Sequence, residues 1–131
     1  MTEVKTPWIE NLGGVPAHLE YQQGTMYEAV ESIALRYPDY IAYDFMGGKT
    51  SYKTFVKEIN DCARALKAIG VQEGEAVTIC MPNAPQALVM FYAVNLIGAV
   101  SNMIHPLSSE KEIEFCLRKS GSAVCLTLDQ M

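Results

Sequence analysis

The chain has 131 residues, of which 50% are hydrophobic, so it has the length of one domain and enough apolar material for a sizeable core. Fifteen acidic residues against ten basic ones give a net charge of -5, and no lysine- or arginine-rich cluster appears along the sequence. Because nucleic acids and anionic membranes select clustered positive charge, this composition argues against both as the main partner.

No targeting or membrane segment is predicted. Residues 1–10 contain no apolar run, so we expect no signal peptide. The longest apolar segment, residues 87–100, is shorter than the ~20 residues that cross a bilayer and favours a buried core helix. The four cysteines (Cys62, Cys80, Cys116 and Cys125) include no C-x-x-C pair. We therefore predict buried free thiols in a cytoplasmic protein.

The first segment of the chain is predicted to be an extended arm, residues 1–24. It contains Pro7, Gly13, Gly14, Pro16 and Gly24, and its apolar residues follow no sustained period. We expect the arm to lie over the domain formed by residues 25–131. The expected anchors are its apolar side chains, which are Trp8, Ile9, Leu12, Val15 and Leu19.

A helix and a hairpin are predicted to follow the arm. Residues 25–28 (T-M-Y-E) match a capping box, which predicts a helix over residues 26–37 that ends at Pro38. Residues 40–45 are typical of a strand and residues 49–51 of a second one. Gly47 and Gly48 are expected to supply the positive φ angles of the tight turn between them.

A second helix is predicted after the hairpin. Thr50 or Ser51 can cap its start, apolar residues recur on one face from Phe55 to Ile69, and Gly70 is expected to end it. The residues of that apolar face are Phe55, Val56, Ile59, Cys62, Ala63, Leu66 and Ile69.

Residues 74–106 are predicted to form a strand, a helix and a second strand. Residues 76–81 (AVTICM) are apolar and partly β-branched without alternation, which is typical of a strand covered on both faces in a parallel sheet. Asn83 is expected to cap the helix, with Pro85 in its first turn. Only Asn95 is clearly polar over residues 87–100, so this helix is expected to be central. The second strand ends at His105, and the crossover should be right-handed.

The remaining residues predict one more helix and one more strand. Residues 109–112 (S-E-K-E) form a second capping box, Ile113, Cys116 and Leu117 form the expected buried stripe, and Gly121 ends the helix. Residues 123–128 (AVCLTL) are typical of a third strand. The predicted fold class is therefore α/β, with a mainly parallel sheet, helices on both faces, an N-terminal arm and a β-hairpin.

Ligands bind such sheets at the carboxyl ends of the strands, which here are residues 80–83, 103–105 and 128 onward. His105 lies on this edge. A structural or pocket-lining role is favoured over acid–base catalysis for it, because no partner group is visible. Cys80 lies inside an apolar strand, where burial raises the pKa of a thiol, so a nucleophilic role is disfavoured.

Other candidate motifs have simpler interpretations. Residues 47–50 (G-G-K-T) match the tail of a P-loop, but Tyr43 stands where its first glycine is needed, and a hairpin turn explains the glycines. Gly70 and Gly74 follow a helix, not a strand, so they do not form a dinucleotide fingerprint. His18 and His105 are too far apart in sequence to suggest a metal site. The residues alone therefore predict no catalytic, cofactor-binding or metal-binding residue.

Short strings along nearly the whole chain resemble the opening segment of the adenylate-forming acyl-CoA synthetases. Each string is weak alone, and their order and spacing carry the resemblance. The strings after residue 50 are Tyr52-x-x-Phe55, Ala63-x-x-Leu66, Gly70-Val71-x-x-Gly74-x-x-Val77, Met81-Pro82-Asn83, Gly98-Ala99-Val100, His105-Pro106 and Glu112-Ile113. The start of the chain, with Pro7-Trp8, residues 15–21 and residues 25–28, is similar to the bacterial long-chain fatty acid CoA ligases in particular.

The resemblance implies a two-step ligase. ATP and a carboxylic acid, with magnesium, give an acyl adenylate and pyrophosphate, and the thiol of coenzyme A then displaces AMP to form a thioester. It also implies that the phosphate loop, the adenine-binding segment, the magnesium ligand and the mobile lysine of such enzymes lie beyond Met131. We therefore expect this chain to be the N-terminal, incomplete piece of a larger adenylating domain. We expect none of the residues for ATP, magnesium or coenzyme A to lie in it, and it should be inactive alone.

Two alternatives remain open. Many members have Asn-Pro where this chain has His105-Pro106 and a Tyr-Thr-Pro-like string where it has residues 107–109, so an aryl, medium-chain or short-chain acid is an alternative substrate. The other alternative is a complete small α/β module that binds a nucleotide or a partner without chemistry. The oligomeric state has no signature in the sequence.

Overall fold

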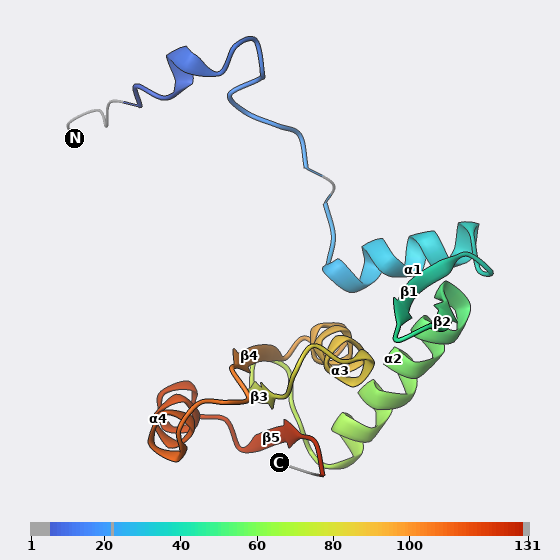
Figure 1. Ribbon diagram of the computed structural model, residues 1–131, viewed down its shortest axis with the longest axis vertical. Coiled ribbons are helices and arrows are strands. Elements are labelled where there is room, and N and C mark those ends of the chain that lie inside the picture. Colours follow the sequence, from blue (N-terminus) through green and yellow to red (C-terminus); the bar gives the residue numbers. More distant parts are fainter. Residues whose placement is uncertain (1–5, 22, 130–131) are drawn as a thin grey trace.

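The computed structural model describes residues 6–21 and 23–129 (Figure 1). The elements are η1 (Ile9–Asn11), α1 (Met26–Arg36), β1 (Ile41–Phe45), β2 (Gly48–Ser51), α2 (Tyr52–Ala68), β3 (Ala76–Cys80), α3 (Pro85–Leu96), β4 (Val100–Ile104), α4 (Glu110–Ser120) and β5 (Val124–Thr127).

The centre of the fold is a parallel sheet with the strand order β4-β3-β5. The middle strand β3 aligns Val77 with Ser101 on β4 and with Val124 on β5. Helix α3 connects the middle strand β3 to the edge strand β4. Helix α4 then connects β4 to β5, which is the edge strand on the other side of β3. This arrangement confirms the predicted α/β class with a parallel sheet.

One face of the sheet carries the hydrophobic core. Val77 and Ile79 of β3 are fully buried there, together with Ile59 of α2 and Val94 of α3. Helices α2 and α3 lie together on this side in Figure 1, and α4 lies on the other. Because successive side chains of a strand point to opposite faces, the alternate residues of β3 face α4. The apolar strand is thus covered on both faces, as expected.

The face toward α4 contains a polar network around Thr78, whose side chain is fully buried. The hydroxyl of Thr78 donates to Oγ of Ser122 (2.9 Å) and accepts from Nδ2 of Asn102 (2.8 Å). Asn102 also donates to Oγ of Ser120 (3.1 Å), which lies 2.8 Å from Oγ of Ser122. These bonds join β3, β4 and the end of α4. They satisfy polar groups that would otherwise be costly to bury.

The predicted helix caps are present. Thr25 and Glu28 form the reciprocal capping box of α1, and Ser109 and Glu112 form that of α4. Ser51, one of the two residues expected to cap the next helix, accepts from the backbone N–H of Thr54. Gly121 closes α4 in the left-handed conformation (φ 67°). These local signals act within one helical turn, which is why the sequence reveals them.

Three local predictions differ from the structure. Asn83 does not cap α3: the N-cap is Ala84, and no side chain accepts a bond there. Helix α3 ends at Leu96, because Gly98 at φ 75° reverses the chain before Val100 begins β4. In the hairpin the positive φ angles belong to Met46 (52°) and Gly47 (86°), since Gly48 already belongs to β2.

Helix α4 is covered less than expected. The predicted stripe of Ile113, Cys116 and Leu117 is only half-buried, and none of the residues of α4 is fully buried. A single short helix covers this face of the sheet, so its contact area is small. Among the described residues, no helix is both long enough and apolar enough to span a bilayer.

The N-terminal arm leads away from the rest of the chain in Figure 1. Residues 9–11 form a 3-10 turn within it, so it is not extended throughout. Four of the expected anchors are exposed and Leu12 is half-buried. The exposed four are Trp8, Ile9, Val15 and Leu19. The arm's described backbone hydrogen bonds, such as Val15 N–H to the carbonyl of Leu12, are local.

Candidate functional site at the strand ends

The carboxyl ends of the parallel strands surround a cavity of about 550 Å³. We call it the strand-end cavity, and its lining residues are Met81, Pro82, Asn83, His105, Pro106, Leu107 and Leu128. Each of the segments that follow β3, β4 and β5 contributes to it. The cavity lies where the connections from the sheet diverge to opposite faces, which is the usual ligand position in open α/β sheets. The predicted position of the ligand edge therefore coincides with a cavity.

His105 has a structural contact at the rim of this cavity. Its Nδ1 accepts a hydrogen bond from the backbone N–H of Leu107 (3.1 Å), and its carbonyl accepts from the N–H of Ser108 (3.1 Å). A neutral ring that accepts at Nδ1 carries its proton on Nε2. The imidazole thus holds the turn after β4 and retains one donor. This arrangement agrees with the lining role that the sequence favoured.

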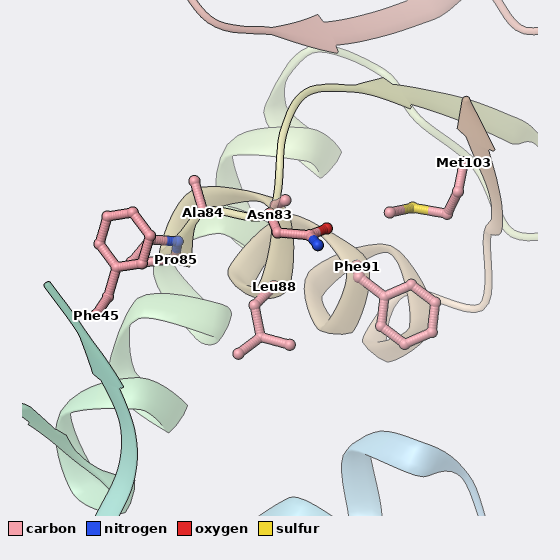
Figure 2. Close-up of a pocket in the computed structure, with 8 residues that line it drawn as sticks. Phe45, Asn83, Ala84, Pro85, Leu88, Phe91 and Met103 are labelled. Carbon is pink, nitrogen blue, oxygen red and sulfur yellow. The ribbon is translucent and has the colours of Figure 1, made fainter. Parts of the chain in front are cut away.

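Asn83 lines a second cavity as well, of about 340 Å³, which lies beside α3 (Figure 2). We call this cavity the α3 groove, and its lining residues are Phe45, Asn83, Ala84, Pro85, Ala87, Leu88, Phe91 and Met103. Because Ala84 is the N-cap, the amide of Asn83 is not used for capping. Within the described part of the chain it has no hydrogen-bond partner. Asn83 is therefore a polar group shared by both cavities, a role that its position before a helix did not reveal.

None of the described residues that line the strand-end cavity is charged. A triphosphate needs cations or converging backbone N–H groups, and magnesium prefers carboxylate oxygens. The described lining side chains supply neither a cation for a triphosphate nor a carboxylate for magnesium. An uncharged part of a ligand fits this cavity better, because its described lining residues are apolar except for Asn83 and His105.

The other sequence motifs have structural roles. Residues 47–50 lie in the hairpin, not between a strand and a helix. Gly70 follows the end of α2, and the N–H of Gly74 donates to the carbonyl of Gly98 (2.9 Å). Among the described residues, no group of three or more His, Cys, Asp or Glu side chains is arranged to hold a metal ion.

The cysteines are free, but they are not all buried as predicted. Cys80 is buried, Cys62 and Cys116 are half-buried, and Cys125 is exposed because its side of the edge strand β5 is not fully covered. Partial burial raises the pKa of the Cys62 thiol. Desolvation also raises the pKa of Cys125, with a smaller contribution from nearby Cys80. Neither shift favours a reactive thiolate.

Comparison with known proteins identifies one family. The profile of the family described as AMP-binding enzyme matches residues 30–131. A long-chain-fatty-acid–CoA ligase of Bacillus subtilis is 31% identical over 124 residues, which are 94% of this chain and 22% of that protein. Acetyl-coenzyme A synthetase 1 of Candida glabrata is 29% identical over 119 residues, 86% of this chain and 17% of the synthetase.

Solved structures share the fold. The N-terminal subdomain of Klebsiella oxytoca NpsA matches with a TM-score of 0.78 at 23% identity, over 83% of this chain and 29% of that one. The N-terminal domain of FACL13 from Mycobacterium tuberculosis, solved with an inhibitor, matches with a TM-score of 0.77 at 27% identity, over 80% of this chain and 27% of that one. The chain therefore spans less than a third of the length of each of these relatives.

Proposed function

This chain belongs to the AMP-binding enzyme family, and we propose that it is the N-terminal piece of an ATP-dependent fatty acid CoA ligase. The complete protein would use ATP and magnesium to convert a fatty acid into an acyl adenylate. It would then transfer the acyl group to coenzyme A. The piece by itself would be inactive.

One observation carries this proposal. The chain aligns over 94% of its length with a long-chain-fatty-acid–CoA ligase but corresponds to only 22% of that enzyme. The uncharged strand-end cavity supports the same interpretation. Without a cation or a carboxylate among its lining residues, it lacks the groups that bind a triphosphate and its metal ion. Those groups would have to come from the rest of the longer protein.

The choice of a long-chain acid rests on that alignment and on the start of the chain. A relative named as an acetyl-coenzyme A synthetase also matches, which motivates a short-chain acid as an alternative substrate. Aryl and medium-chain acids are further alternatives, because residues 105–109 depart from the string that many members have. The test is a panel of acids of increasing chain length, with aryl acids included, and acyl-CoA formation by the full-length protein as the readout. We expect the highest kcat/KM with long-chain acids. Preference for acetate or an aryl acid would contradict the fatty acid assignment and leave the ligase assignment intact.

The competing function is a small α/β module that binds a nucleotide or a partner without catalysis. Its motivating observation is that the described residues form a sheet with a hydrophobic core of their own. The reading frame of the gene separates the two functions. A frame that continues past codon 131 into several hundred further residues supports the ligase, whereas a native stop codon at that point supports the module.

A further inference from the structure

The α3 groove is an apolar surface with little cover. Leu88, Phe45 and Met103 are 38%, 42% and 52% exposed, and none of the described residues that line the groove is charged. Figure 2 shows the side chain of Leu88 pointing away from α3, with Phe45 on one side and Phe91 on the other. A contiguous apolar hollow of this kind marks a place for an apolar polypeptide segment or ligand.

The N-terminal arm contains a segment with one apolar side. Val15, Ala17, Leu19 and Tyr21 alternate with Pro16, His18 and Glu20. In an extended chain such alternation places all of the first set on one face. Three of these side chains are prominently exposed in the structure: Val15 by 58%, Leu19 by 54% and Tyr21 by 75%. The segment therefore has an apolar face without cover, like the groove.

The arm joins the rest of the chain close to the C-terminal end of α3, the helix that lines the groove. The backbone N–H of Tyr27, in the first turn of α1, donates to Oδ1 of Asn95 (3.0 Å). Asn95, Phe91, Leu88 and Ala84 follow one another at intervals of three and four residues, so they lie along one face of α3. An arm that reverses direction at Gly24 (φ 136°) would run along this row.

The lengths of the two segments match. At the rise of an α-helix, Leu88 and Ala84 lie about 10 and 16 Å from Asn95 along the axis. In an extended chain, Tyr21 and Leu19 lie about 13 and 20 Å from Thr25. We propose that the arm folds back along α3 as a strap, with Tyr21 against Leu88 and Phe91 and with Leu19 beside Phe45 at the start of the helix. The position in Figure 1 is then the open form of this strap.

The test uses the fact that Trp8 is the only tryptophan in the chain. In a W8F background, tryptophan is introduced at Tyr21 (Y21W) or, as an exposed reference, at Leu35 of α1, which is 81% exposed (L35W). We expect the emission of Y21W to be blue-shifted relative to L35W and its acrylamide quenching to be several-fold weaker. Far-UV circular dichroism checks that each variant is folded.

The groove is tested by adding Leu88→Gln to both proteins. Leu88 is partly exposed, so the polar replacement should leave the fold intact while it weakens the apolar contact. We expect L88Q to return the emission of Y21W to the exposed value and to leave that of L35W unchanged. Exposed emission from Y21W would overturn the proposal, as would a blue shift that persists in L88Q. A blue shift that disappears on dilution would also overturn it, because the arm would then contact a second copy.

Discussion

At the scale of single residues, Thr78 shows how a polar side chain can be accommodated in the middle of a buried strand. Its hydroxyl is both donor and acceptor within the network that joins β3 to β4 and α4. We predict that T78V, which keeps the shape and removes the hydroxyl, lowers the free energy of unfolding by about 1–3 kcal/mol. Urea unfolding followed by circular dichroism measures it.

The control is T78S, which keeps the hydroxyl and loses only a methyl group. Its loss should be smaller, about 1 kcal/mol. If T78V were as stable as the original chain, the hydrogen bonds around Thr78 would have no net stabilising effect.

Glu112 gives a prediction about pH. Its carboxylate accepts from the N–H (2.8 Å) and from the hydroxyl (3.0 Å) of Ser109, and these bonds lower the pKa of Glu112. A carboxyl whose pKa is lowered by folding stabilises the fold above its unfolded pKa of about 4.3, and this stabilisation is lost as the pH falls through the folded pKa. E112Q should therefore be less stable than the original chain near neutral pH, with a difference that shrinks on acidification.

The matched control for this prediction is E110Q. Glu110 also lies in the first turn of α4, but it is not part of the capping box. Its substitution removes a charge near the helix N-terminus without breaking the reciprocal bonds. We expect chemical denaturation at a series of pH values to give a larger pH-dependent difference for E112Q than for E110Q. Equal differences would assign the effect to charge alone.

The residues of the candidate site were only partly predictable from the sequence. His105 and the segment after β3 were predicted to lie at the strand ends, because a parallel sheet brings these ends to one edge. The shared position of Asn83 was not, since it depends on which residue has the N-cap backbone conformation, and Ala84 has it (φ -129°, ψ 159°). The partners of Thr78 are Asn102 of β4 and Ser122, which lies between α4 and β5, and their proximity depends on the strand register.

At the scale of elements, a single glycine constrains the connection between α3 and β4. Gly98 has φ 75°, and a Cβ added there would lie 2.9 Å from Cγ of Glu73. We predict that G98A destabilises the chain by about 1–2 kcal/mol through the left-handed backbone, with a further loss from this contact. Thermal or urea unfolding measures the change.

Gly70 provides the comparison. It has φ 98°, but an added Cβ would have no atom within 4 Å, so G70A reports the backbone penalty without the contact. G98A should therefore be the more destabilising of the two, and E73A should reduce the difference between them. A G98A chain as stable as the G70A chain would show that Glu73 moves aside without cost.

The elements were predictable where local chemistry determines them. Both capping boxes and the glycines that follow α2 and α4 were recognised from a few adjacent residues. The end of α3 was predicted too late because residues 97–100 continue the apolar run, which conceals the break at Gly98. The incomplete cover of α4 was also missed, because apolar spacing on a helix does not tell how much surface its partner offers.

At the scale of the whole molecule, the strand-end cavity agrees with the proposal that this chain is one piece of a larger adenylating enzyme, because its described lining residues include no charged side chain. The groove beside α3 and the arm are explained separately, by the proposed strap. The sequence predicted the larger enzyme by resemblance and not by periodicity, since no pattern in the chain encodes what lies outside it. The match of the family over residues 30–131 confirms the family.

The most direct test of the proposed function is ATP–pyrophosphate exchange in the presence of a long-chain fatty acid. It would be measured in parallel for the 131-residue chain and for the protein expressed from the complete reading frame. We predict fatty acid-dependent exchange by the longer protein and none by the chain alone, because the described residues of the strand-end cavity include neither a cationic side chain for a triphosphate nor a carboxylate for its magnesium ion. Exchange catalysed by the 131 residues alone would contradict this account.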